Sequence, residues 1–151
     1  MGPYPVTAGF LVSLAFTQAK AGQAADAQKT LDRLRSMPVN SGDNYTGIRA
    51  AMGDLKGALE DASRLEGTSR NLALRAIVEA EINKGEFSQA TDTAHKMSEP
   101  ERSTALDRIA LLQSDIQAKS GELKAAIQTV ASIQDARVRI NALLRVAPHI
   151  K

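Results

Sequence analysis

Few residues in this sequence have a type and spacing that could perform chemistry. There are two histidines, His95 and His149, and no cysteine. The histidines are far apart in the chain, and neither belongs to a two-histidine metal-ligand motif. Glu79 and Glu81 are two residues apart, so on a helix they point to different faces and cannot act as a carboxylate pair. We therefore predict no catalytic residues, no metal site and no cofactor.

The glycines carry no nucleotide-binding pattern. They lie singly along the chain, which excludes a phosphate-binding loop and a dinucleotide-binding fingerprint, and the Gly-x-Ser-x-Gly motif of serine hydrolases is missing. Without such motifs no residue stands out as catalytic. We expect a protein that is not an enzyme.

Four glycines instead begin copies of a short phrase, in which a glycine is usually followed by an acid, an apolar residue, two spacers and an alanine. The copies start at Gly22, Gly53, Gly85 and Gly121, at separations of 31, 32 and 36 residues. A period of about 20 to 50 residues indicates stacked structural units. Each glycine is expected to end one helix with a positive φ and to lead into the next.

A second phrase, R-x-x-A-L-x-x-[I/V], begins at Arg70, Arg102 and Arg139 and sets the register of the first helix in each unit. We name the helix before each phrase glycine the A helix and the helix after it the B helix. These patterns predict one domain, 1–151, with units over residues 8–38, 43–66, 69–97 and 99–133 and a capping helix over 135–147. The capping helix is expected to shield the preceding pair and to leave one face polar.

Local signals predict where the helices begin and end. Pro3 and Pro5 predict an irregular lead-in over residues 1–5, and residues 39–44 are rich in turn formers. The predicted N-caps are Thr7, then Asp43 or Asn44, then Thr68 or Ser69, and finally Ser98 in a capping box with Glu101. The A helix of the fourth unit should be one turn longer, because Gly121 follows Ile109 by twelve residues while Gly85 follows Ile77 by eight.

The composition narrows the classes of partner. The chain has 151 residues, 19 Lys and Arg against 17 Asp and Glu, and 3% aromatic residues, which favours neither nucleic acid nor a membrane surface. No stretch approaches the roughly 20 apolar residues of a membrane span. Residues 8–16 are apolar, but the first lysine is Lys20, so we favour a helix there over a signal peptide. The compartment stays open: cytoplasmic by default, or periplasmic or secreted if a signal was removed.

With both phrases in register, the chain resembles the tetratricopeptide repeat family over about residues 8–147. Leu74, Ile77 and Val78 match helix A core positions of the family, and the alanine of each phrase matches its small helix B residue. The tryptophan and tyrosine of the family are missing, and HEAT-type repeats remain the alternative. The resemblance implies an all-α fold, an α-solenoid of about four antiparallel helix pairs plus a C-terminal capping helix.

The resemblance also implies a concave face, lined by the A helices, that binds a peptide or partner protein. Counted from the turn glycines, the residues expected on that face are Val12, Phe16, Lys20, Arg75, Glu79, Asn83, Leu111, Asp115 and Lys119. The simpler interpretation is that these residues form a solvent-exposed surface on which side chains four residues apart make ordinary pairs. Two other roles remain: a structural spacer or self-associating, homo-oligomeric fragment, and a nucleic-acid binder using Arg70, Arg102 and Arg139. Pairing of these arginines with neighbouring acids, or packing of their stems, is the simpler account of them.

Overall fold

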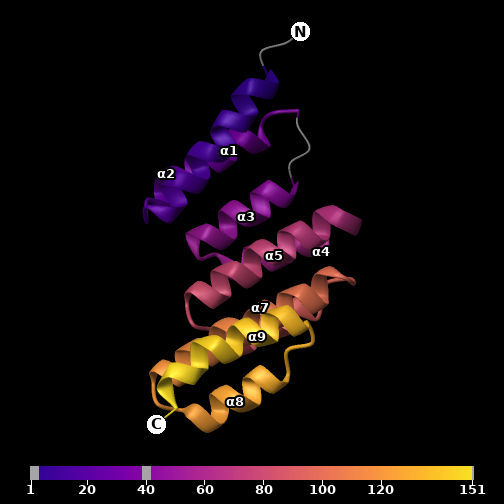
Figure 1. Cartoon of the computed structure of the whole chain (residues 1–151). Coiled ribbons are helices and arrows are strands. Elements are labelled where there is room, and N and C mark those ends of the chain that lie inside the picture. Colours follow the sequence, from indigo (N-terminus) through magenta and orange to yellow (C-terminus); the bar gives the residue numbers. More distant parts are fainter. Residues whose placement is uncertain (1–3, 39–41, 151) are drawn as a thin grey trace. The chain divides into compact units, whose positions relative to one another are not determined.

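The computed structural model describes residues 4–38 and 42–150, and every regular element within these ranges is a helix (Figure 1). This confirms the prediction of an all-α fold. The elements in chain order are α1 (Tyr4–Lys20), α2 (Ala24–Arg35), α3 (Gly42–Met52), α4 (Leu55–Ser63), α5 (Gly67–Asn83), α6 (Phe87–Ala94), α7 (Glu101–Lys119), α8 (Leu123–Ala131), α9 (Ala136–Val146) and the short 3-10 helix η1 (Ala147–His149).

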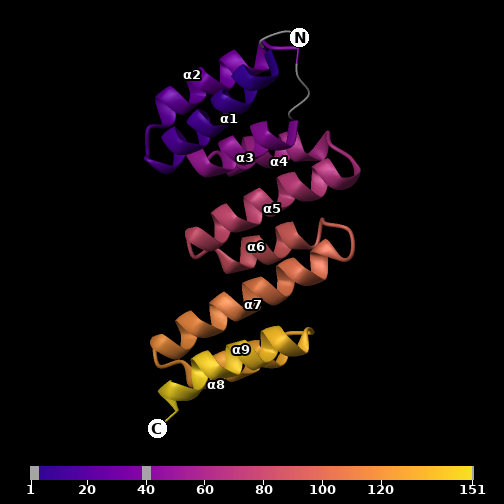
Figure 2. The ribbon, with the colours of Figure 1, turned by 45° about the horizontal axis from the view of Figure 1, so that its top comes forward.

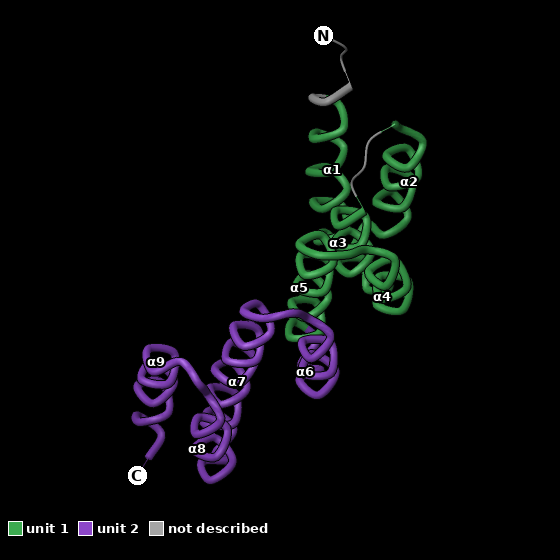
Figure 3. Tube along the Cα trace, turned by 90° about the vertical axis from the view of Figure 1, so that its right-hand side faces the viewer, with its two compact units in different colours: residues 1–83 green, residues 84–151 purple. Residues whose placement is uncertain are grey.

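The chain forms two compact units, which Figure 3 shows in different colours. Unit 1 is Met1–Asn83 and unit 2 is Lys84–Lys151. The boundary lies at the turn of the third predicted repeat, so the A helix of that repeat, α5, belongs to unit 1 and its B helix, α6, to unit 2.

In unit 1 the A helices form a row. Helix α1 contacts α3, and α3 contacts α5 (Figure 2), while α2 and α4 lie on the same side of that row (Figure 3). One hydrophobic cluster joins the first helices of the unit, because the apolar stripes of α1, α2 and α3 meet there. Its buried residues are Ala8, Leu11, Ala15, Leu31, Leu34 and Ile48.

In unit 2 the long helix α7 contacts each of the other α-helices, α6, α8 and α9. Helix α8 also packs on α9. The apolar stripes of α7, α8 and α9 meet in one cluster, whose buried residues are Ala110, Ala118, Ala126, Val130, Ile133, Ala142 and Val146.

The phrase glycines act as predicted. Gly22, Gly53, Gly85 and Gly121 have φ of 75°, 90°, 77° and 83°, a region that residues with a Cβ rarely adopt. The alanine of each phrase is fully buried, which allows its B helix to approach the neighbouring helix closely. These alanines are Ala27, Ala58, Ala90 and Ala126.

Several predicted helix starts are wrong, because the helices begin earlier than the cap signals suggested. Helix α1 begins at Tyr4, inside the predicted lead-in; Pro5 lies in its first turn, where proline is tolerated. Thr7 is therefore within the helix. Helix α3 begins at Gly42 and α5 at Gly67, so the predicted caps of these helices lie inside their first turns: Asp43, Asn44, Thr68 and Ser69. Residues 39–41 of the predicted turn lie outside the described residues.

The capping box predicted for α7 is also wrong. The N-cap residue is Pro100, and the carboxylate that serves the first turn comes from Glu99. Glu99 Oε2 accepts hydrogen bonds from the Ser103 amide at 3.2 Å and the Ser103 hydroxyl at 2.7 Å, and Glu99 Oε1 pairs with Arg102 Nε at 2.8 Å. These contacts, the Ser103 hydroxyl bond first, lower the pKa of Glu99.

The length of α7 agrees with the spacing of the repeats. Helix α7 continues ten residues past Ile109, whereas α5 continues six residues past Ile77. Among the described residues, no helix is both long and apolar enough to cross a membrane.

The exposed surface of α9 is polar in one part, where Arg137, Asn141 and Arg145 follow one another at intervals of four residues, and apolar in another. Ile140, Leu143 and Leu144 are 58%, 48% and 69% exposed. The residues of α9 that pack inward, Ala142 and Val146, are buried. Helix α9 therefore covers the preceding pair with one face and presents an apolar surface on another.

Candidate functional site

The residues predicted on the A helix of the first unit differ in their surroundings. Val12 and Phe16 are half-buried and pack against the cluster that joins α1, α2 and α3. The Phe16 ring lies directly over Gly47 of α3, where an added Cβ would be 2.8 Å from Phe16 Cζ. Lys20, the last residue of α1, is exposed. Of the three, only Lys20 has a fully accessible side chain.

Helix α5 carries the clearest surface stripe. Arg75, Glu79 and Asn83 follow one another at intervals of four residues and so lie along one side of the helix. Arg75 and Asn83 are exposed, and neither side chain makes a hydrogen bond or ion pair with another described residue. Glu79 is half-buried and does have a polar partner. The stripe presents a cation and an amide that remain available to a ligand.

Of the three residues predicted on α7, one packs against the core and the other two pair with each other. Leu111 is half-buried against the cluster of unit 2. Asp115 Oδ2 and Lys119 Nζ form an i,i+4 ion pair at 2.7 Å. The structure therefore brings Asp115 and Lys119 together, and this supports the simpler interpretation for that pair.

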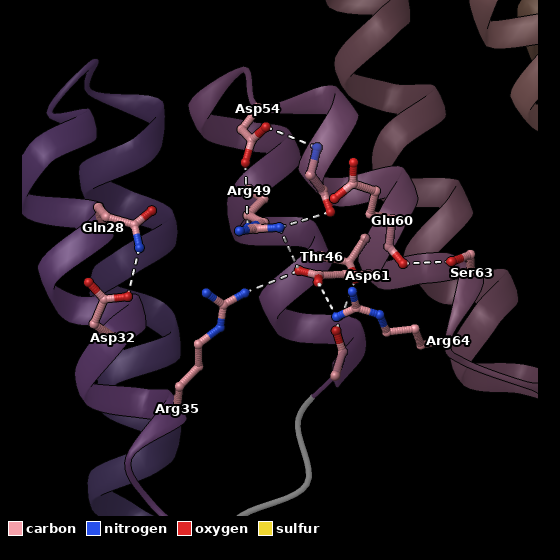
Figure 4. Close-up of polar contacts among 12 residues, drawn as sticks. Gln28, Asp32, Arg35, Thr46, Arg49, Asp54, Glu60, Asp61, Ser63 and Arg64 are labelled. Carbon is pink, nitrogen blue, oxygen red and sulfur yellow. Dashed lines mark hydrogen bonds and ion pairs between the residues drawn. The ribbon is translucent and has the colours of Figure 1, made fainter.

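Unit 1 also contains a polar network centred on Asp61 of α4, which Figure 4 shows. Asp61 Oδ2 is 3.2 Å from Arg35 Nη2 of α2 and 3.2 Å from Arg49 Nη1 of α3. Arg64 Nη1 lies 3.9 Å from Asp61 Oδ1. Arginines from α2, from α3 and from the residue that follows α4 therefore converge on one carboxylate, which is only 18% exposed.

Arg49 extends this network to the turn between α3 and α4. Its Nη1 donates to the Gly57 carbonyl at 2.9 Å, and its Nε lies 3.5 Å from Asp54 Oδ2. Asp54 caps α4 by accepting a hydrogen bond from the Gly57 amide at 3.0 Å. A Cβ at position 57 would lie 2.3 Å from Asp54 Oδ2 and 2.6 Å from Arg49 Nη1, so this close approach requires glycine.

The Arg49–Asp61 contact has counterparts in other repeats, where different side chains meet at the equivalent positions. It joins the residue four before a phrase glycine to the residue eight after it, and we name these two positions the clasp. In the first repeat Thr30 Oγ1 donates to Gln18 Oε1 at 2.8 Å, and in the fourth Thr129 Oγ1 donates to Gln117 Oε1 at 2.8 Å.

The clasp positions of the third repeat are also polar. They are occupied by Glu81 in unit 1 and Thr93 in unit 2, and both side chains are buried. The sequence contained the signal, since a polar residue recurs at these positions among apolar ones in all four repeats. Prediction from apolar stripes alone did not identify it.

Two hollows lie beside these features. One, in unit 1, has a volume of about 430 Å³ and borders the Asp61 network. Although Arg35, Arg49 and Arg64 line it, Asp61 and Glu60 line it as well, so much of its positive charge is compensated.

The second hollow, in unit 2, has a volume of about 490 Å³ and is lined by amides and hydroxyls over an apolar floor. Its one acid, Asp107, is occupied, because it accepts hydrogen bonds from the backbone amides of Gln134 and Asp135 at 2.8 Å each.

Two of the three arginines that repeat in register, Arg102 and Arg139, have partners within the described chain. Arg102 pairs with Glu99, and Arg139 Nη1 donates to the Ile133 carbonyl at 3.4 Å. Within residues 4–38 and 42–150, no group of three or more His, Asp or Glu side chains is placed to hold a metal ion.

Comparison with known proteins identifies no relative. No protein-family model, no curated protein and no solved structure matches this chain.

Proposed function

We propose that the chain is a tetratricopeptide-like helical repeat, an α-solenoid of about four antiparallel helix pairs closed by α9. In this proposal it binds a peptide or a partner protein on the surface of its A helices. It acts by binding and not by catalysis.

One observation carries the proposal: positions at the same distance from each turn glycine have the same backbone conformation, burial or polar contact. In all four repeats the glycine has a positive φ and the alanine five residues later is fully buried, and in the first, second and fourth repeats the clasp residues pair an A helix with its B helix. Repetition of backbone, packing and polar contacts in one register is the property that defines a helical repeat.

The stripe on α5 supports a binding role for the A helices. The guanidinium of Arg75 and the amide of Asn83, which pair with no other described residue, offer donors along one side of α5. Side chains of this kind recognise the carbonyl and carboxylate groups of a peptide. Lys20 adds a cation at the end of α1, another A helix of the same unit.

Affinity capture from cells tests the proposal. Wild-type chain is compared with the triple variant Arg75→Ala, Glu79→Ala and Asn83→Ala. The matched control changes an amide, an acid and an arginine on a B helix of the same unit: Gln28→Ala, Asp32→Ala and Arg33→Ala. We expect the first triple variant to lose a partner that the wild type and the control recover; equal recovery by all three would reject the binding face.

A further inference from the structure

Two exposed positions of α9 are apolar where the equivalent positions of α7 are polar, and a third, Leu143, matches Leu106 of α7. In the register set by the R-x-x-A-L-x-x-[I/V] phrase, Ile140 and Leu144 of α9 occupy the positions of Ser103 and Asp107 of α7. In α5 the same positions hold Asn71 and Arg75. A helix that only closed a stack would keep polar residues there, so this change needs another explanation.

The equivalent face of α7 is covered by the chain itself. Asp107 is buried, and it accepts hydrogen bonds from the backbone amides of Gln134 and Asp135, which connect α8 to α9. On α9 the described residues provide no such cover, and Ile140, Leu143 and Leu144 are 48% to 69% exposed. Single exposed apolar residues are ordinary, but three at i, i+3 and i+4 form a continuous ridge.

Charge indicates what covers this ridge. Helix α9 contains three arginines and no acid. Arg137 precedes Ile140 by three residues and Arg139 precedes Leu143 by four, so each borders the ridge on the helix surface. A partner that meets the ridge therefore meets positive charge along its edges, and acidic residues on that partner would complement it.

We propose that the ridge Ile140, Leu143 and Leu144 docks an amphipathic helix of a partner protein, with its own apolar residues at i, i+3 and i+4 and acidic residues beside them. Ridges of this spacing pack into the grooves of another helix. A second copy of α9 is disfavoured, since it would bring arginines against arginines. A membrane surface is disfavoured too, because α9 lacks aromatic residues and its other face is packed on α7 and α8.

Fluorescence anisotropy of the full chain with two labelled helical peptides tests this assignment. Both peptides carry leucines at i, i+3, i+4 and i+7; one has glutamates at the bordering positions and the other has lysines. We expect the glutamate peptide to bind at least about tenfold more tightly than the lysine peptide, with a difference that shrinks as salt is raised. The double variant Arg137→Glu and Arg139→Glu should reverse the preference.

Leu144→Ser should weaken the glutamate peptide by about tenfold or more, because a leucine is removed from the contact. Ile127→Ser is the matched control: Ile127 is also apolar and is 48% exposed, but it lies on α8, so binding should be unchanged. Circular dichroism checks that both variants are folded; because both side chains are exposed, we expect no loss of helix.

Four outcomes would overturn the proposal. They are equal binding of both peptides, no binding of either, a wild-type dimer in sedimentation that Leu144→Ser dissociates, and flotation with anionic vesicles that Leu144→Ser abolishes. The inference is independent of the A-helix stripe on α5. The triple variant of Arg75, Glu79 and Asn83 should therefore still bind the glutamate peptide, so failure of one proposal is distinguishable from failure of the other.

Discussion

Arg49 and Asp61 form an ion pair between α3 and α4, with 3.2 Å between Nη1 and Oδ2, at positions where other repeats use glutamine and threonine. The side chains are 22% and 18% exposed, so the pair is largely removed from water. Partly buried polar groups of this kind stabilise a fold only when their partners are present. The clasp is therefore a place where the repeat register can be tested by substitution.

Asp61→Asn should destabilise the chain by about 2 kcal/mol, because Arg35 and Arg49 lose their shared carboxylate in a half-buried site. The free energy of unfolding in urea measures this change. Asp26→Asn is the control, since Asp26 pairs with Lys29 on an exposed surface and its loss should cost less than about 0.5 kcal/mol. Equal effects of the two substitutions would contradict a structural role for the network.

The clasp positions of the second repeat should tolerate the glutamine and threonine that the first and fourth repeats have there. The double variant Arg49→Gln and Asp61→Thr recreates the Gln18–Thr30 pair of the first repeat. We expect it to be more stable than the sum of the two single changes predicts, by about 0.5 kcal/mol or more. Strict additivity in a double-mutant cycle would show that the two positions do not act as a pair.

The sequence predicted the all-α fold and the turn glycines better than the ends of the helices. The phrase glycines and buried alanines mark turns and close contacts through backbone geometry and size, which depend little on the rest of the fold. Cap residues were misplaced because Ser, Thr, Asp and Asn are also tolerated inside a first turn. The clasp was missed because the prediction followed the apolar stripes and did not compare the polar residues, such as Gln18 and Thr30, that recur at equivalent positions.

Helix α9 shows the same limit. The phrase beginning at Arg139 places Ala142 and Val146 inward, as in α5 and α7. The exposed apolar surface combines the phrase residue Leu143 with Ile140 and Leu144, which lie between the phrase positions and which the phrase does not specify. Phe16 was predicted on the binding face but is half-buried, because its ring packs on Gly47 of α3. This contact joins two A helices and is not visible in the periodicity of either one.

Two glycines should respond to alanine in opposite directions. Gly47→Ala should destabilise the chain by about 1 kcal/mol, since the new Cβ displaces the Phe16 ring at a cost larger than the gain in helix propensity. Gly9→Ala should stabilise it by up to about 1 kcal/mol, because Gly9 is exposed within α1 and no neighbour lies within 4 Å of the added Cβ. Thermal unfolding of both variants measures this. Stabilisation by both would exclude close packing at Gly47.

Glu99 should make part of the stability depend on acid pH. Its pKa is lowered in the folded state, chiefly by the hydrogen bond from Ser103, so its contribution is present above the unfolded pKa and is lost as the pH falls through the folded pKa. Glu99→Gln should therefore differ from wild type near neutral pH and converge with it in acid. Glu101→Gln, in the same first turn without a side-chain hydrogen bond to the described chain, is the control and should run parallel to wild type. A constant offset between Glu99→Gln and wild type at every pH would contradict the assignment.

Site-specific photo-crosslinking tests the proposed binding face most directly. A photoreactive amino acid is placed at Arg75 or Asn83 on α5, or at Arg33 on α2 as the control, and the chain is irradiated in cells. We predict one common adduct from positions 75 and 83 and its absence from position 33. An adduct from position 33 alone, or none from positions 75 and 83, would contradict the assignment of partner binding to the A helices.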